Sequence, residues 1–185
     1  MGGILVVDPG ARPFGRHLRS LLAGLPRLEG RPIHIQAGAG LRGAGGQIHA
    51  GAFLRERRIA FDRALMQAPD EFERIFVHEL FHFAWLRLGN PRRRSYEEVV
   101  RGECERDAVG ELGWSAEWRK RVLAQSDRQR RSRRWREYVC ESFCDTAAWR
   151  FSGLRRHPEF TLPPPWRSRR ARWFEHFIET KRISI

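Results

Sequence analysis

The chain has 185 residues, of which 41% are hydrophobic, and its 35 Lys and Arg against 22 Asp and Glu give a net charge of +13. This length supports one hydrophobic core and is short for two, so we expect a single domain over residues 1–185. No run approaches about 18 consecutive apolar residues, and "ILVV" lacks the basic lead-in of a signal peptide, so we expect a cytoplasmic protein with no membrane contact.

The charge of the chain is carried almost entirely by arginine. A surface of this kind attracts phosphates and acidic chains through its summed field, and it carries no information about the fold. Acidic polypeptides and nucleic acids are therefore the partners that the charge favours.

The three cysteines are Cys104, Cys140 and Cys144. An odd number in a chain expected in the cytoplasm argues against a disulfide framework. We interpret them as small, buried apolar residues.

The first third of the chain is predicted to form one helix and a few short strands. Leucines at helical spacing in "RHLRSLLAGL" predict an amphipathic helix that ends near Pro26. Alternation over Ile33–Ile35 predicts a strand, and four glycines in residues 39–46 predict a loop. One or two further strands follow, with Arg57–Phe61 placed just before the next helix.

A long helix is predicted over residues 71–88. Asp70 and Glu73 have the spacing of a capping box, and "GNP" at residues 89–91 supplies a stop signal. A basic turn is expected to follow, before the next helical segment.

The remainder of the chain is predicted to be mainly helical. One helix should begin near Arg134 and end at Gly153. The strongly basic segment Arg119–Arg136 is expected to be exposed or mobile. After a proline run, an apolar stripe that includes Trp173 and Phe177 predicts a last helix.

The stretch "IFVHELFHFAW" contains the pattern H-E-x-x-H at His78, Glu79 and His82. Residues four positions apart on a helix lie on one face, about one turn apart, so both imidazoles can bind a single metal ion. Glu79 would then lie beside the ion, where it can polarise a water in an open coordination position. The pattern predicts a hydrolytic Zn²⁺ site.

A hydrolytic zinc site usually has three protein ligands, so one more must come from elsewhere. Glu141 and Asp145 lie at positions i and i+4 of a strongly apolar predicted helix, where two acids are costly to bury without partners. We expect Glu141 to be the third ligand. Asp145 is expected to accept a hydrogen bond from the second nitrogen of His78 or His82 and so to fix its tautomer.

Other third ligands remain open. Glu103 lies a short distance after His82 and also has an acid four residues on, but its polar surroundings are typical of a solvated helix face. The further alternatives are His157, Cys140 and Cys144.

The combination of "HELFH" with the later "ESFCD" resembles the gluzincin group of zinc metallopeptidases, and most closely its minimal single-domain members. The resemblance covers about residues 57–151. It implies an α+β, zincin-like domain with a small mixed sheet, an active-site helix and a glutamate helix beside it. The catalytic core would span about residues 28–153, followed by a C-terminal extension over residues 154–185.

The resemblance also implies a metalloendopeptidase in which Glu79 acts as general base and then passes the proton to the leaving amine. The edge strand of the sheet would lie above the cleft, and Arg57–Phe61 would pair with an extended substrate. Tyr138, Tyr96 and His157 are the candidate donors to the oxyanion. The net charge favours an acidic polypeptide as substrate.

Two other functions compete with this one. The first is a nucleic-acid-associated metalloprotease resembling the SprT-like proteins, which the basic runs favour. Those proteins bind zinc through a third histidine, and His157 would have to be that ligand here. The second alternative is a non-catalytic, basic nucleic-acid-binding domain with a structural zinc. In the absence of metal, His78 and His82 would be hydrogen-bonded core histidines, and Glu141 with Asp145 would form a buried charge network with arginines such as Arg150.

Overall fold

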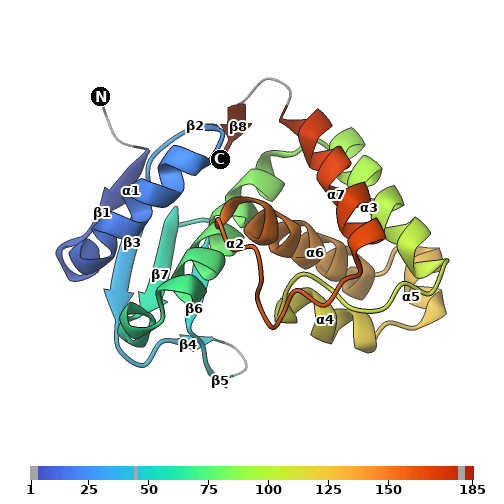
Figure 1. Cartoon of the computed structure of the whole chain (residues 1–185), viewed down its shortest axis with the longest axis horizontal. Helices are drawn as coiled ribbons and strands as arrows, with labels where there is room; N and C mark the ends of the chain where they lie inside the picture. The colour runs from blue at the N-terminus through green and yellow to red at the C-terminus, as the bar shows by residue number, and fades with distance from the viewer. Residues whose placement is uncertain (1–3, 44–45, 179–181) are drawn as a thin grey trace.

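The computed structural model describes residues 4–43, 46–178 and 182–185. It is an α+β structure with a small mixed sheet. The sheet lies on one side of the long helix α2 (Pro69–Arg87), and a group of helices lies on the other side (Figure 1). Helix α2, which carries the two histidines of the motif, therefore lies between the two parts of the fold.

The α-helices are α1 near the start of the chain, the long helix α2, and a group of helices in the second half of the chain. Their bounds are α1 (Gly15–Gly24), α2 (Pro69–Arg87), α3 (Asn90–Cys104), α4 (Trp114–Arg121), α5 (Gln125–Arg130), α6 (Arg133–Phe151) and α7 (Pro164–Phe177). Two 3₁₀ helices, η1 (Pro9–Phe14) and η2 (Arg63–Gln67), precede α1 and α2. None of the helices in the described ranges combines the length and the apolar content needed to cross a bilayer.

The main sheet has four strands in the order β1-β3-β7-β6. These are β1 (Leu5–Val7), β3 (Ile33–Gly38), β7 (Arg58–Asp62) and β6 (Ala50–Phe53). Strands β1, β3 and β7 are parallel, and β6 runs antiparallel to β7. Two short pairs complete the strands: β2 (Arg27–Glu29) with β8 (Arg182–Ser184), and β4 (Arg42–Gly43) with β5 (Gly46–Gln47).

The sheet edge differs from the sequence-based expectation. Strand β7, which contains most of the segment predicted to receive substrate, lies inside the sheet between β3 and β6. Its consecutive residues Ile59, Ala60 and Phe61 are all buried, which is typical of a strand covered on both faces. Strand β6 forms this edge of the sheet instead, and α2 packs against it.

Helix α2 begins slightly before its predicted start. Ala68 is its N-cap residue and makes no side-chain cap, while Pro69 occupies the first turn, where its missing N–H costs nothing. The predicted capping box is therefore wrong: Asp70 lies inside the helix, and Glu73 contacts Nδ1 of His17 at 3.2 Å. Apolar residues surround the helix because it is packed between the sheet and α6.

The expected basic turn after α2 is also wrong. Helix α3 begins at Asn90 with Gly89 as its N-cap, so the arginines at residues 92–94 are helical. Pro91 in the first turn starts this helix instead of ending the preceding one.

The basic segment Arg119–Arg136 is mostly exposed, as expected, yet most of it is helical, because it spans the end of α4, α5 and the start of α6. Trp135 anchors it in the core: its side chain is fully buried and its indole N–H donates to Glu97 at 2.7 Å. Arg131 pairs with the same carboxylate.

Candidate metal centre

The candidate site lies between α2 and α6, which pack against each other. Helix α2 supplies His78 and His82 from successive turns of one face, and α6 supplies Glu141. His78 is buried, and the other two side chains are partly buried. Ligand atoms of these three residues come close enough together to hold a metal ion.

The three ligand atoms already have the spacing of a common coordination shell. Nε2 of His78 lies 3.2 Å from Nε2 of His82 and 3.2 Å from Oε2 of Glu141, and the latter lies 3.8 Å from Nε2 of His82. With bonds of about 2.0–2.1 Å, ligand atoms on one tetrahedral zinc lie roughly 3.3 Å apart. The donor set therefore fits such an ion with an adjustment of about half an ångström at most, between Glu141 and His82.

Asp145 fixes the orientation of His78. Its Oδ1 lies 2.7 Å from Nδ1 of His78, and its Oδ2 accepts the backbone N–H of Ala116 at 2.9 Å. Nε2 of His78 is thereby directed toward His82 and Glu141. Burial acts to lower the pKa of His78, but the charge and hydrogen bond of Asp145 outweigh burial and raise that pKa well above its usual value.

Glu141 is held from the opposite side by Arg119 of α4, whose Nη2 lies 3.2 Å from Oε1. Burial acts to raise the pKa of Glu141, but its interactions with His78, His82 and Arg119 lower it to about 2. Glu141 is therefore ionised at neutral pH, as a metal ligand must be.

Glu79 is half-buried on α2, directly after His78. The same helix therefore carries both histidines and the acid expected to act as the base.

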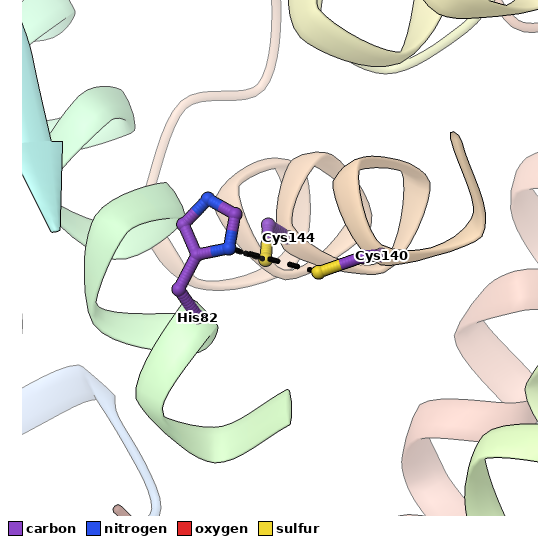
Figure 2. Close-up of side chains that lie close together, drawn as sticks. All are labelled: His82, Cys140 and Cys144. Carbon is purple, nitrogen blue, oxygen red and sulfur yellow. Dashed lines mark hydrogen bonds between the residues drawn. The ribbon is translucent and has the colours of Figure 1, made fainter. Parts of the chain in front are cut away.

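The second nitrogen of His82 faces two thiols (Figure 2). Nδ1 lies 3.5 Å from Sγ of Cys144 and 3.7 Å from Sγ of Cys140, both on α6. From the sequence, these cysteines are interpreted mainly as packing residues, and their gathering around His82 is not predicted. The available signal was their i, i+4 spacing, one residue before the Glu141–Asp145 pair.

Glu103, the alternative third ligand, lies elsewhere in a buried ion pair. Its carboxylate accepts from Nη2 of Arg170 at 2.6 Å, and neither side chain has any exposed surface. The expected solvated helix face is therefore wrong. Among the described residues, the group of donors that includes both histidines has Glu141 and not Glu103 as its acid.

The three proposed oxyanion donors have other partners. The hydroxyl of Tyr138 donates to Oε1 of Glu111 at 2.6 Å, and that of Tyr96 donates to the carbonyl of Ser142 at 2.9 Å. Both tyrosines are fully buried.

His157, the third candidate donor, has its Nε2 2.8 Å from Oε1 of Glu71. With Glu71 and Glu159 it forms a separate group of potential ligands. It does not join the group formed by His78 and His82 in the described part of the chain.

Comparisons with protein families, with curated proteins and with solved structures found no match to this chain. The fold and the site together define an α+β protein with groups of His, Cys and acidic residues that could hold a metal ion.

Proposed function

We propose that this chain is a zinc-dependent metallopeptidase, similar to the minimal gluzincins with a zincin-like fold. The observation that carries the proposal is the convergence of His78, His82 and Glu141 at distances of 3.2–3.8 Å, with Asp145 bonded to the outer nitrogen of His78. Two imidazoles and one carboxylate are a donor set that catalytic zinc sites use, and zinc accepts such a set with an open fourth position.

Each residue then has a defined role. A zinc ion bound here would supply Lewis-acid chemistry, acidifying a water and polarising a peptide carbonyl. Glu79 accepts the proton of the attacking water and delivers it to the leaving amine. Asp145 keeps the lone pair of His78 on Nε2, and Arg119 orients Glu141 through its second oxygen.

The substrate is proposed to pair with β6. An extended peptide can add to a sheet edge through main-chain hydrogen bonds, and β6 is the edge strand that packs against α2. This assignment replaces Arg57–Phe61, because β7 already uses both of its sides for β3 and β6.

An arginine-lined pocket beyond the end of β6 supports a preference for acidic chains. Four arginines and one acid, Glu56, line it. Arg31 precedes β3, Arg55 and Arg57 lie in the turn between β6 and β7, and Arg87 ends α2. Burial and the like charges of Arg87 and Arg31 lower the pKa of Arg57, so an acidic group bound there would relieve repulsion. A peptide along β6 would reach this pocket with one end.

The nucleic-acid alternatives have less support. A SprT-like site needs a third histidine, and His157 is instead bonded to Glu71. A nucleic-acid-binding function depends on the net charge of +13 alone. Binding to duplex and single-stranded DNA at increasing salt would test it, because phosphate contacts make affinity fall steeply with ionic strength.

The metal assignment is tested by zinc content and by X-ray absorption at the zinc edge. We expect one zinc per chain with nitrogen and oxygen neighbours. His78→Ala and Glu141→Ala should lose this coordination, whereas Glu79→Gln should keep it. Retention of the same coordination in Glu141→Ala would contradict the ligand set.

The activity is tested on a complex peptide mixture from denatured cell protein, with new termini identified by mass spectrometry. The zinc-loaded protein should generate new termini, enriched near acidic residues, and Glu79→Gln should not. Cleavage by Glu79→Gln at the rate of the unaltered protein, or no cleavage by either, would refute the peptidase.

A further inference from the structure

The side of His82 that faces away from His78 presents a second set of donors. Nδ1 of His82 and the sulfurs of Cys140 and Cys144 all lie within 4.8 Å of one another, from the facing surfaces of α2 and α6 (Figure 2). The peptidase mechanism leaves both thiols unused.

The spacing of these atoms is that of a metal shell. With bonds of about 2.3 Å to sulfur and about 2.0–2.1 Å to nitrogen, a sulfur and a nitrogen on one tetrahedral ion lie roughly 3.5 Å apart. The observed separations from Nδ1 of His82 are 3.5 Å to Cys144 and 3.7 Å to Cys140. A weak hydrogen bond from one imidazole N–H would not require two sulfurs at these distances.

We propose that Cys140, Cys144 and Nδ1 of His82 form a second metal site that is selective for thiophilic ions. This site cannot be filled while Nε2 of His82 serves the first site, which is the group formed by His78, His82 and Glu141. Thiolates are soft ligands that favour soft ions such as Cd²⁺ and Cu⁺ over hard cations. Cys140 is partly exposed, which gives an ion a route to the buried Cys144.

The exclusion follows from the chemistry of one ring. A neutral imidazole has one nitrogen with a free lone pair and one that carries a proton. When Nε2 of His82 binds the first ion, Nδ1 keeps its proton and points it at the thiols. When Nδ1 binds a second ion, the proton moves to Nε2, which then no longer ligates beside His78 and Glu141.

The two sites therefore act as alternatives. An ion held by the two thiolates withdraws one of the three ligands of the first site, so thiophilic ions inhibit the protein by rearranging His82. The second site itself does not depend on the peptidase, whereas the exclusion depends on the metal centre proposed above.

The first test titrates the reduced, metal-free, full-length protein with Cd²⁺ and follows the thiolate-to-cadmium absorption in the ultraviolet. We expect saturation at one Cd²⁺ per chain. Cys140→Ser and Cys144→Ser should each weaken binding about tenfold or more, and the double variant should lose the band. Cys104→Ser is the matched control and should behave like the unaltered protein, since Cys104 lies beside Tyr138 and away from this group.

His78→Ala removes the first site alone and should keep the cadmium band, so the second site is tested even if the peptidase proposal fails. X-ray absorption of the unaltered protein, counting two sulfurs and one nitrogen around cadmium, does not depend on the folding of any variant. An absent band, or a band that persists in the double variant, would overturn the site.

The second test adds Cd²⁺ to protein that carries zinc at the first site and measures released zinc with a chelating dye. Release of about one zinc per bound Cd²⁺ is expected, with little release from the Cys140→Ser/Cys144→Ser double variant. Two ions held together on one chain, or equal release from the double variant, would refute the shared use of His82.

Discussion

Oδ1 of Asp145 on α6 lies 2.7 Å from Nδ1 of His78 on α2, although the two residues are 67 positions apart in the sequence. The other oxygen of Asp145 accepts the N–H of Ala116 near the start of α4. The carboxylate therefore ties the face of α2 that carries His78 to both α6 and α4. This bond directs Nε2 of His78 toward His82 and Glu141.

Asp145→Asn should weaken metal binding at the first site. The amide keeps the shape of the side chain but offers a single acceptor oxygen, so either His78 or Ala116 loses its partner. Loss of such an outer partner typically costs about 10–100-fold in metal affinity. Zinc affinity measured against a competing chelator checks this. Glu137→Gln, on the exposed side of the same helix, is the control, and an unchanged affinity in Asp145→Asn would contradict the orienting role.

Gly113→Ala should disturb the same carboxylate by steric overlap. A Cβ at Gly113 would overlap the carboxylate of Asp145, in a fully packed interior. We expect a loss of about 1–3 kcal/mol in unfolding free energy together with weaker zinc binding. Gly24→Ala, where the added methyl meets nothing within 4 Å, should be neutral or stabilising by up to about 1 kcal/mol. Urea unfolding measures both, and equal effects of the two substitutions would count against the contact.

The residues of the first site were predictable because the relevant signals are local. The i, i+4 spacing of His78 with His82, and of Glu141 with Asp145, places each pair on one helix face without knowledge of the rest of the fold. The cost of burying acids on an apolar helix then indicates that the two faces meet. Their catalytic roles stay predictions.

Other features depended on distant parts of the chain. Glu103 has polar neighbours in sequence, and its burial depends on Arg170, 67 positions later, which no local pattern reveals. The interior position of β7 depends on strand pairing with β3 and β6, which turn signals and alternation do not determine. The direction in which Nδ1 of His82 points likewise depends on how α2 packs on α6.

Arg170→Met should be strongly destabilising. Arg170 is fully buried and its guanidinium donates to both Glu103 and Glu111. Its removal takes the cation from buried Glu103 and leaves Glu111 with Lys120 alone, at 3.3 Å. Breaking a buried pair in this way costs about 3–5 kcal/mol. Arg172→Met, exposed on the same helix, should change stability by less than about 0.5 kcal/mol. Urea unfolding at neutral pH distinguishes them, and similar midpoints for the two variants would disprove the central role of Arg170.

The same cluster predicts how stability depends on pH. Burial acts to raise the pKa of Glu111, but Arg170, Lys120 and the hydrogen bond from Tyr138 together outweigh burial and lower that pKa. A lowered pKa in the folded state contributes stability that is complete above the unfolded value of about 4.3, and is lost as pH falls through the folded value. Unfolding free energies from pH 7 to pH 3 should therefore fall more steeply for the unaltered protein than for Glu111→Gln. Parallel curves would show that Glu111 does not carry this dependence.

Tyr138→Phe separates a structural role from a catalytic one. The hydroxyl of Tyr138 is buried and donates to Oε1 of Glu111 at 2.6 Å, so its removal should cost about 1–3 kcal/mol of stability. Because the hydroxyl is engaged in this bond and not with the proposed metal ligands, zinc affinity and peptide hydrolysis should stay unchanged at temperatures where the variant is folded. If Tyr138 were an oxyanion donor, the loss of its hydroxyl would instead lower the rate of hydrolysis by about 10²-fold or more, with zinc still bound. Tyr96→Phe, whose hydroxyl is bonded to Ser142 and Thr146, provides the matched comparison and should show the same pattern.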